Sequence, residues 1–377
     1  MKFSCLQENL KSGLLAVSHI AGKNINLPIL NNILIKITGG DIKLITTDLE
    51  VGITCLVRGK VEKAGAFTVD AKISSDFISL LPNKKIDIEK KENKLIIKSD
   101  NYKTTIIGQS AEDYPLIPQI DKNSVYKADI EEFKRALTQV LFAVSTSETR
   151  VELAGVLFSF SGKNITLAAT DSYRLAEKTI NVSAKTNKKN DPKIIIPAKT
   201  LQELVRILSN IREEGVKNSE KEIEFYVSDN QILFLYNNIE LISRLIEGQY
   251  PDYKQIIPIN NKTTATINRD ELIRAVKAAA IFSKTGINDI NLDFPLGKNS
   301  VVVSSASSQA GENITKLAAD VSGRENSIVV NCRYLLDGLN NISAEDLLLN
   351  IVDGNTPCTL RPEKNNSYQY IIMPIKQ

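Results

Sequence analysis

The feature that most constrains how this chain folds is that its sequence repeats. The segment Phe3–Asp48 aligns with Tyr126–Asp171 without a gap. Three hydrophobic residues at helical spacing coincide in the two copies, namely Leu10, Leu14 and Val17 with Phe133, Leu137 and Val140. Both segments therefore predict an amphipathic helix. A repeat of this length predicts similar domains in a row rather than one continuous fold.

Two strands are predicted after each of these helices, because hydrophobic and polar residues alternate there. The alternating positions coincide, with Ile33, Ile35, Ile37, Ile42 and Leu44 aligned to Val156, Phe158, Phe160, Ile165 and Leu167. Gly39 aligns with Gly162 at the predicted turn, and Thr47-Asp48 aligns with Thr170-Asp171. A third, fainter copy continues the pattern with Leu272, Val276 and Ala279 on its helix and Leu292, Phe294, Leu296, Val301 and Val303 on its strands. Its helix begins with Asn268 and Glu271, which resemble a capping box.

Each copy has a second half, in which a strand leads into another helix. The three junctions read Val69-Asp70-Ala71-Lys72, Ile196-Pro197-Ala198-Lys199 and Val330-Asn331-Cys332-Arg333. Proline-bearing segments at 113–115 and 249–253 are natural linkers between copies. We therefore predict an α+β fold of three similar domains, residues 1–124, 125–257 and 258–377, each with two helix-plus-sheet halves. Such domains favour an arc, which self-association would close into a ring.

Composition excludes several classes of protein. The 47 basic and 44 acidic residues give a net charge of +3, and 42% of the residues are hydrophobic, as in ordinary globular proteins. No stretch approaches the roughly 20 apolar residues that span a bilayer. The apolar residues 13–17 resemble a weak secretion signal, but the same pattern recurs inside the chain, so we interpret them as helix. The four cysteines lack metal-ligand spacing, and the chain has one histidine, so we expect no metal, no cofactor and a cytoplasmic location.

Catalytic motifs are absent from the sequence. It contains no phosphate-binding GxxxxGK[ST] loop, no GxGxxG, no HExxH and no GxSxG. We interpret His19 as a structural histidine with a hydrogen-bond partner, since the second copy has Phe142 at the same position. Asp171, with Arg174 nearby, could suggest a catalytic pair. Because Asp48 mirrors Asp171 directly after a strand, an ion pair or turn cap is the better interpretation.

Cations occupy one position in all three second-half helices. Lys72, Lys199 and Arg333 lie near the helix N-terminus, where a positive charge opposes the helix dipole. One interpretation is that each is solvated and paired with a neighbouring acid. The other is that these helices contact the phosphates of a common polyanion without reading its bases. The further candidates on polar helix faces are Lys11, Lys134, Arg135, Arg206, Arg274 and Lys277. No aromatic residues are interleaved for base stacking, which favours duplex over single-stranded nucleic acid.

Seven short motifs, in order from one end of the chain to the other, resemble the bacterial sliding clamp, the beta subunit of DNA polymerase III. They are Phe3 with Leu27-Pro28-Ile29-Leu30-Asn31-Asn32, Thr47-Asp48-Leu49-Glu50, Glu112-Asp113-Tyr114-Pro115, Ala169-Thr170-Asp171 with Arg174-Leu175-Ala176, Tyr250-Pro251-Asp252-Tyr253, Asn331 with Tyr334-Leu335, and Tyr370-Ile371-Ile372-Met373-Pro374-Ile375. The resemblance implies a non-catalytic DNA clamp that closes a ring as a head-to-tail homodimer. Duplex DNA passes through the ring, which tethers the polymerase to its template.

The resemblance also implies one pocket, between domains two and three, that binds short peptide motifs. Its expected occupants come from the DNA polymerase III catalytic subunit, the clamp loader, other polymerases and repair proteins. Carried over by position, its walls are Leu153, Thr170, Ser172, Tyr173, Arg174, Leu175, Pro251, Gln255, Ile256, Met373, Pro374, Ile375 and Lys376. The apolar C-terminal end with Met373 fits an adaptable binding surface. A plain terminal strand that closes the last sheet is the alternative.

The ring joint is expected between the first domain of one subunit and the third domain of the other. By position it involves Lys103, Thr104 and Ile106 on one side and Ile281 and Phe282 on the other. Two functions from other classes stay open at this point. A hydrolase that uses Asp48 or Asp171 requires a polar cluster specific to one copy, and a scaffold protein requires no DNA contact.

Overall fold

The computed structural model describes residues 1–22, 27–118, 120–122, 124–147, 149–185, 192–210 and 221–376. Its internal contacts divide the chain into two compact units, which are described separately below. The first holds Met1–Ile130, Val182–Lys189 and Lys199–Leu245, and the second holds Glu131–Asn181, Asn190–Ala198 and Ile246–Gln377. Each unit thus combines one terminal copy of the repeat with half of the middle copy. The three domain ranges based on the repeat stay a prediction, because the boundaries of the two compact units fall at other residues.

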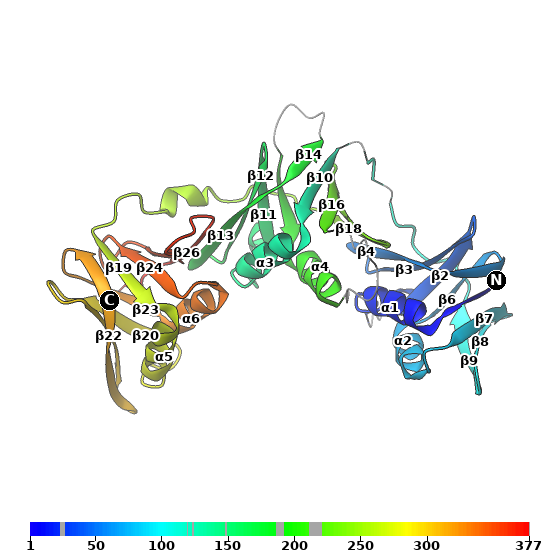
Figure 1. The fold of residues 1–377 in the computed structure, drawn as a ribbon, viewed down its shortest axis with the longest axis horizontal. Helices are drawn as coiled ribbons and strands as arrows, with labels where there is room; N and C mark the ends of the chain where they lie inside the picture. Colours follow the sequence, from blue (N-terminus) through cyan, green and yellow to red (C-terminus); the bar gives the residue numbers. More distant parts are fainter. Residues whose placement is uncertain are drawn as a thin grey trace. The chain divides into compact units, whose positions relative to one another are not determined.

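The first unit is built on one antiparallel sheet of 14 strands, in the order β14-β10-β16-β17-β18-β4-β3-β2-β6-β9-β8-β7-β1-β5. Its elements are β1 (Lys2–Leu6), α1 (Gln7–Val17), β2 (Asn32–Thr38), β3 (Asp41–Thr47), β4 (Val51–Val57), β5 (Gly59–Lys63), β6 (Gly65–Asp70), α2 (Ala71–Leu80), β7 (Lys85–Lys91), β8 (Lys94–Ser99), β9 (Tyr102–Gln109), β10 (Val125–Asp129), β14 (Ser183–Lys185), α4 (Ala198–Asn210), β16 (Glu222–Val227), β17 (Gln231–Tyr236) and β18 (Ile239–Arg244). Helices α1 and α2 pack on each other and on one face of this sheet (Figure 1).

The second unit has a sheet of 12 strands, in the order β15-β11-β12-β13-β26-β25-β24-β19-β22-β21-β20-β23. Its elements are α3 (Ile130–Leu141), η2 (Val151–Ala154), β11 (Gly155–Ser161), β12 (Asn164–Thr170), β13 (Arg174–Asn181), β15 (Lys193–Pro197), η3 (Tyr253–Ile256), β19 (Thr263–Asn268), α5 (Arg269–Ala280), β20 (Asp289–Phe294), β21 (Ser300–Ser307), β22 (Gly311–Gly323), β23 (Asn326–Asn331), α6 (Cys332–Asn341), β24 (Asp346–Ile351), β25 (Cys358–Pro362) and β26 (Tyr368–Ile372). Helices α5 and α6 pack together, as α1 and α2 do in the first unit (Figure 1).

The predicted helices and strands of the repeat are confirmed, except that Leu296 is wrong as a strand residue, since it follows the end of β20 and is 66% exposed. The three predicted helix residues of the first copy, Leu10, Leu14 and Val17, are buried, so the apolar start of the chain is part of the core. Helix caps follow the local sequence: the Asp70 carboxylate accepts from Ile73 N at the start of α2, and Asn268 accepts from Glu271 N at the start of α5. No helix among the described residues is long and apolar enough to cross a membrane.

The strand pairing that joins one copy to the next is the same in both units. In the first unit β18 pairs with β4, and Ile242 lies opposite Gly52. In the second unit β26 pairs with β13, and Ile371 lies opposite Leu175. Gly52 and Leu175 occupy equivalent positions of the repeat. The repeated sequence therefore sets the register of both junctions, because a slip by one residue would turn every side chain to the other face.

Candidate partner-binding and DNA-contacting surfaces

The tight turn between β12 and β13 carries several of the predicted site residues. Asp171 Oδ1 accepts hydrogen bonds from Tyr173 N at 2.9 Å and from Arg174 N at 3.0 Å, and Asp171 Oδ2 pairs with Arg174 Nε at 2.9 Å. Thr170 Oγ1 donates to Arg174 O at 2.6 Å. The prediction that Asp171 serves as a turn cap and ion-pair partner is confirmed.

The same turn is built in the first copy between β3 and β4. Asp48 Oδ1 accepts from Val51 N at 2.8 Å, and Thr47 Oγ1 donates to Val51 O at 2.9 Å. The residue after each aspartate has positive φ, 79° at Leu49 and 80° at Ser172. Because both aspartates are occupied by their own turns, neither is presented as a catalytic carboxylate.

The Arg174 side chain is a structural anchor of the second unit. Its guanidinium pairs with Asp337 on α6 and donates to Phe142 O, just past the end of α3, at 2.9 Å. The Tyr334 ring lies 4.7 Å from the guanidinium carbon. Burial alone lowers the pKa of Arg174, but Asp337 and Asp171 outweigh it and raise that pKa above its ordinary value. With these contacts, Arg174 holds α3, α6 and the turn together.

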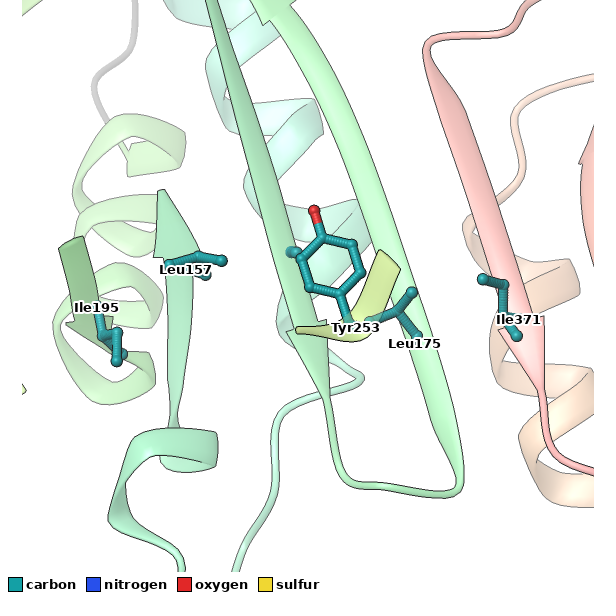
Figure 2. Close-up of a cluster of buried hydrophobic side chains, with 6 residues drawn as sticks. Leu157, Leu175, Ile195, Tyr253 and Ile371 are labelled. Atoms are coloured by element: carbon teal, nitrogen blue, oxygen red, sulfur yellow. The ribbon is translucent and has the colours of Figure 1, made fainter. Parts of the chain in front are cut away.

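A hydrophobic cluster lies beside this turn, built on β11, β12, β13, β15, η3 and β26 (Figure 2). It consists of Leu157, Ala168, Leu175, Ile195, Tyr253 and Ile371, with Ile246, Tyr250 and Ile257 packed at its border. Tyr250 OH accepts from Thr170 N at 3.1 Å, and Tyr253 OH donates to Glu177 Oε2 at 2.5 Å. Burial raises the pKa of both tyrosines, which therefore stay protonated. These two residues fix the segment after β18 across the cluster.

The C-terminal residues join the same region through backbone hydrogen bonds. Met373 N donates to Tyr173 O at 2.8 Å, and Ile375 N donates to Val329 O at 2.8 Å. Residues 373–375 are half-buried. Tyr173 is 62% exposed, and its ring stacks on Tyr334 with centroids 6.4 Å apart. The structure thus leaves an aromatic surface open next to the chain end.

Six of the thirteen predicted pocket residues come together here. The turn, the adjacent strand and the C-terminal end bring together Thr170, Ser172, Tyr173, Arg174, Leu175 and Met373. Leu153 is buried on η2, and its neighbour Arg150 donates to Ser172 Oγ at 2.8 Å. Gln255 instead bonds Asp252 within its own turn, and Lys376 is exposed.

Sequence reasoning missed Tyr250, Tyr253, Tyr334 and Asp337 as site residues. The sequence pattern places the first two in a linker, although the two tyrosines that flank Pro251-Asp252 indicate a segment that packs. Tyr334 and Asp337 lie one helical turn apart on α6. Their partnership with Arg174 links segments far apart in the chain, and local sequence carries no signal for it.

The predicted DNA-contacting cations differ in their exposure to solvent and in whether they form ion pairs within the protein. Those with exposed side chains are Lys72, Arg135, Lys199, Arg274, Lys277 and Arg333. Lys11 is half-buried. Lys134 pairs with Glu131 on its own helix at 3.0 Å, and Lys199 pairs with Asp48 at 2.5 Å. The paired interpretation therefore holds for Lys199, while its side chain is 70% exposed.

Arg206 is a correction to the predicted set. Its guanidinium donates to Leu15 O at 3.0 Å and Ala16 O at 2.8 Å, and it also pairs with Glu203. It therefore binds the carbonyl end of α1, where a cation is favoured by the helix dipole. Glu203 also accepts from His19 Nδ1 at 2.6 Å, so His19 has the expected partner. Arg206 is held in the first unit by these contacts and is not a free cation.

Ile106 is a second correction. It is 5% exposed, whereas its neighbour Ile107 is 76% exposed. Successive side chains of a strand point to opposite faces, and β9 turns Ile106 into the core. Ile281, at the C-cap of α5, is 73% exposed. The residues Tyr102–Ile107 pair with β8, and β6 pairs with β9 only at Gly108 and Gln109.

The described residues offer little for metal or thiol chemistry. They contain no group of three or more His, Cys, Asp or Glu that could hold a metal ion. All four cysteines are free and buried. Burial raises the pKa of Cys5, Cys55 and Cys358 to about 12, so these thiols are poor nucleophiles.

Three family models match the chain in order. They are the N-terminal domain of the DNA polymerase III beta subunit at residues 1–118, its central domain at residues 127–252 and its C-terminal domain at residues 254–376. The beta sliding clamps of Staphylococcus epidermidis and Staphylococcus aureus are each 29% identical over 360 residues, which cover 93% of this chain and 92% of the relative.

Solved structures agree with this match. The sliding clamp from Bacillus subtilis is 26% identical with a TM-score of 0.92, over 100% of this chain and 99% of the other. The DNA polymerase III subunit beta from Pseudomonas aeruginosa is 25% identical with a TM-score of 0.92, over 100% of both chains. Another structure of the Pseudomonas aeruginosa clamp, bound to griselimycin, has a TM-score of 0.91 at 25% identity, again over 100% of both chains.

Proposed function

Since this chain belongs to the DNA polymerase III beta subunit family, the bacterial sliding clamps, we propose how its described surfaces carry out clamp function. The protein is a DNA sliding clamp, a processivity factor of the α+β clamp fold. We propose that it is non-catalytic, forms a head-to-tail homodimeric ring in the cytoplasm, and encircles duplex DNA without reading sequence. The observation that carries this proposal is the ordered match of all three beta-subunit domains from residue 1 to residue 376.

Contact with DNA is assigned to the exposed helix cations. Lys72, Lys199 and Arg333 each occupy the second position of their helices, α2, α4 and α6. A cation there opposes the helix dipole, which supports a role outside helix stability. Few, exposed, base-independent phosphate contacts allow a ring to slide, whereas many tight contacts would hold it in place.

The ring joint is assigned to β9 of one subunit and the end of α5 of the other. Ile107 replaces Ile106 in the proposed apolar contact, together with Ile281 and Phe282. Lys103 and Thr104 lie on the same stretch of β9. An apolar strand surface with an unpaired edge is a typical site of self-association.

Partner peptides are assigned to the surface around Tyr173 and Met373. The candidates are short motifs of the DNA polymerase III catalytic subunit, the clamp loader, other polymerases and repair proteins. A relative bound to griselimycin supports a ligand site somewhere on this family's surface. Here an exposed tyrosine, half-buried Met373, Pro374 and Ile375, and an adjacent hydrophobic cluster fit a peptide with apolar side chains.

The competing functions find less support. A hydrolase built on Asp48 or Asp171 would need a free carboxylate, and both bind their own turns. A scaffold without DNA contact is compatible with Lys199, which pairs with Asp48, but it gives no reason for the exposed cations Lys72 and Arg333 at the same helix position.

The test is retention on circular DNA. The protein is loaded by its cognate clamp loader onto nicked circular duplex, and retention is measured by gel filtration before and after the circle is linearised. A clamp stays on the circle and leaves the linear form. The triple variant K72E/K199E/R333E should lose loading or retention, while K163E, on the turn between β11 and β12, should keep both. Equal retention on circles and linear DNA would overturn the topological proposal.

A further inference from the structure

A cavity of about 320 Å³ lies in the second unit, next to α3. Its lining includes Arg135 and Gln139 of α3, Lys178 of β13, and Tyr368 at the start of β26. The loop after α6 and the turn between β25 and β26 complete it, with Glu345 and Lys364 among their residues. The size is that of a small-molecule site.

Two polar side chains of the lining are more than nine-tenths buried and incompletely bonded. Lys178 is 7% exposed, and its ammonium makes one hydrogen bond to a described residue, to Ser367 Oγ at 2.6 Å. An ammonium has three donors, so two are left without a partner among the described residues. Gln139 is 6% exposed; its Nε2 donates to Asn341 O at 3.0 Å, and its Oε1 has no partner among the described residues.

The orientation of the Gln139 amide follows from its chemistry. Asn341 O is an acceptor, so the nitrogen of Gln139 must face it and the oxygen must face away. The unsatisfied groups are therefore a cationic donor at Lys178 and a neutral acceptor at Gln139. Leaving either group buried without a partner costs free energy, which a bound molecule can recover.

The first copy of the repeat shows that the fold does not require these polar groups. In the alignment without gaps, Ser12 and Ala16 stand where the second copy has Arg135 and Gln139. Cys55 corresponds to Lys178, because Cys55 pairs with Leu44 as Lys178 pairs with the aligned Leu167. Cys55 and Lys178 are both buried at equivalent positions of β4 and β13. One copy thus packs a small hydrophobic thiol where the other buries an ammonium. A polar set specific to one copy points to a ligand rather than to folding.

The charges around the cavity restrict the chemical class of ligand that can bind there. Arg135, exposed on α3, adds a second cation near Lys178. The acids of the lining are Glu345 and Glu363, which are exposed on the two loops, and Asp346, which is half-buried at the start of β24. Glu132 and Arg135 act on Lys178 in opposite directions, while burial lowers its pKa most. The cavity thus has one buried cation, Lys178, and one exposed cation, Arg135, and this pair suits an oxyanion of limited size.

We propose that this cavity binds hydrogen phosphate, free or as a monoester that keeps one P–O–H, with its anionic oxygens on Lys178 and Arg135 and that hydroxyl donating to Gln139 Oε1. The hydroxyl matters because Gln139 offers an acceptor. Hydrogen phosphate carries both an O–H and anionic oxygens, whereas sulfate at neutral pH has acceptors alone. The phosphate could belong to a free small molecule or to the 5′ end of a DNA strand.

The test is titration of the full-length protein at pH 7 by isothermal calorimetry with three probes. They are inorganic phosphate, sulfate, and a short DNA duplex with or without 5′-phosphates. We expect saturable phosphate binding that exceeds sulfate binding by about tenfold, since loss of one hydrogen bond in a buried site is worth about 1.4 kcal/mol. Preference for the phosphorylated duplex would identify DNA ends as the source, and free phosphate alone would identify a small molecule.

Three variants make the proposal falsifiable. K178M and R135A should each weaken phosphate binding about tenfold or more, and Q139L should remove the preference over sulfate. K316M, an exposed lysine on β22 of the same unit, should bind like the wild type. Circular dichroism checks that K178M is folded. If K178M does not fold, R135A, at an exposed position, still tests the proposal. Phosphate binding that is absent from the wild type, or unchanged in both K178M and R135A, would overturn the proposal and leave water as the occupant.

Discussion

Ile117 packs against the backbone of Gly52 so closely that a Cβ atom at Gly52 would lie 2.8 Å from Ile117 Cδ1. Ile242 on the neighbouring strand would be 3.1 Å away. The equivalent residue of the second copy is Leu175, over which Tyr253 packs instead. The two copies therefore cover equivalent strand junctions with different pairs of side chains. Ile117 packs on Gly52 in the first copy, and Tyr253 packs on Leu175 in the second.

The substitution Gly52→Leu should destabilise the protein by about 1–3 kcal/mol, because it overfills a packed site. The measurement is urea unfolding followed by circular dichroism. Adding Ile117→Ala should recover part of the loss, with a coupling of about 1 kcal/mol in the double-mutant cycle. Gly22→Ala, at an open position, is the matched control and should change stability by less than about 0.5 kcal/mol. Strict additivity of the two substitutions would contradict the proposed packing.

Arg174→Ala should cost about 2–4 kcal/mol, because it removes a half-buried cation from two carboxylates, a carbonyl and two aromatic rings. Thermal and urea unfolding would measure the loss. Arg333→Ala, on the same helix as Asp337 but exposed, should lie within about 0.5 kcal/mol of the wild type. Equal effects of the two substitutions would show that Arg174 is not an anchor.

Tyr173→Ala should weaken binding of a peptide from the polymerase III catalytic subunit about 5- to 30-fold, since truncated aromatic contacts of this kind cost about 1–2 kcal/mol. Fluorescence polarisation with a labelled peptide would measure it. Stability should hardly change, because the ring is 62% exposed. Leu116→Ala, another exposed apolar position, should leave binding unchanged. A peptide that binds both variants like the wild type would place the partner site elsewhere.

The stability of the first unit should depend on pH through Glu224. Lys127 Nζ lies 2.5 Å from Glu224 Oε1, and Tyr226 OH donates to Oε2 at 2.6 Å. These partners lower the pKa of Glu224 below its ordinary value of 4.5. A carboxylate with a lower pKa in the folded state stabilises the protein above the unfolded pKa, and the gain is lost as pH falls through the folded one.

Glu224→Gln should therefore be less stable than the wild type at pH 7, and the difference should shrink below pH 4.5. Urea unfolding at a series of pH values checks this, with the exposed Glu222→Gln on the same strand as control. At the alkaline end, burial and Glu224 raise the pKa of Tyr226 from 10 to about 12, so its contribution is present below pH 10 and fades toward pH 12. A difference between wild type and Glu224→Gln that is constant with pH would contradict the ion pair.

The sequence by itself determined the repeat and most of what depends on neighbours in the chain. Hydrophobic spacing set the helix at Leu10 and its counterpart at Phe133, and short polar side chains set the caps at Asp70 and Asn268. The turn at Asp171 was predictable because an aspartate three residues before the next strand bonds its own backbone. These features form within a few residues, so local sequence carries the information.

Only the tertiary structure decided which side chains are held by contacts within the protein and which are exposed to solvent. Arg206 resembles any cation on a helix until the end of α1 is placed against it. The sequence does not show which of Ile106 and Ile107 points into the core, since two apolar residues in succession fit either face of a strand. Lys178 is one polar residue in an alternating strand until α3 and two loops close over it. Each outcome depends on contacts between residues distant in the chain, and a one-dimensional pattern does not contain them.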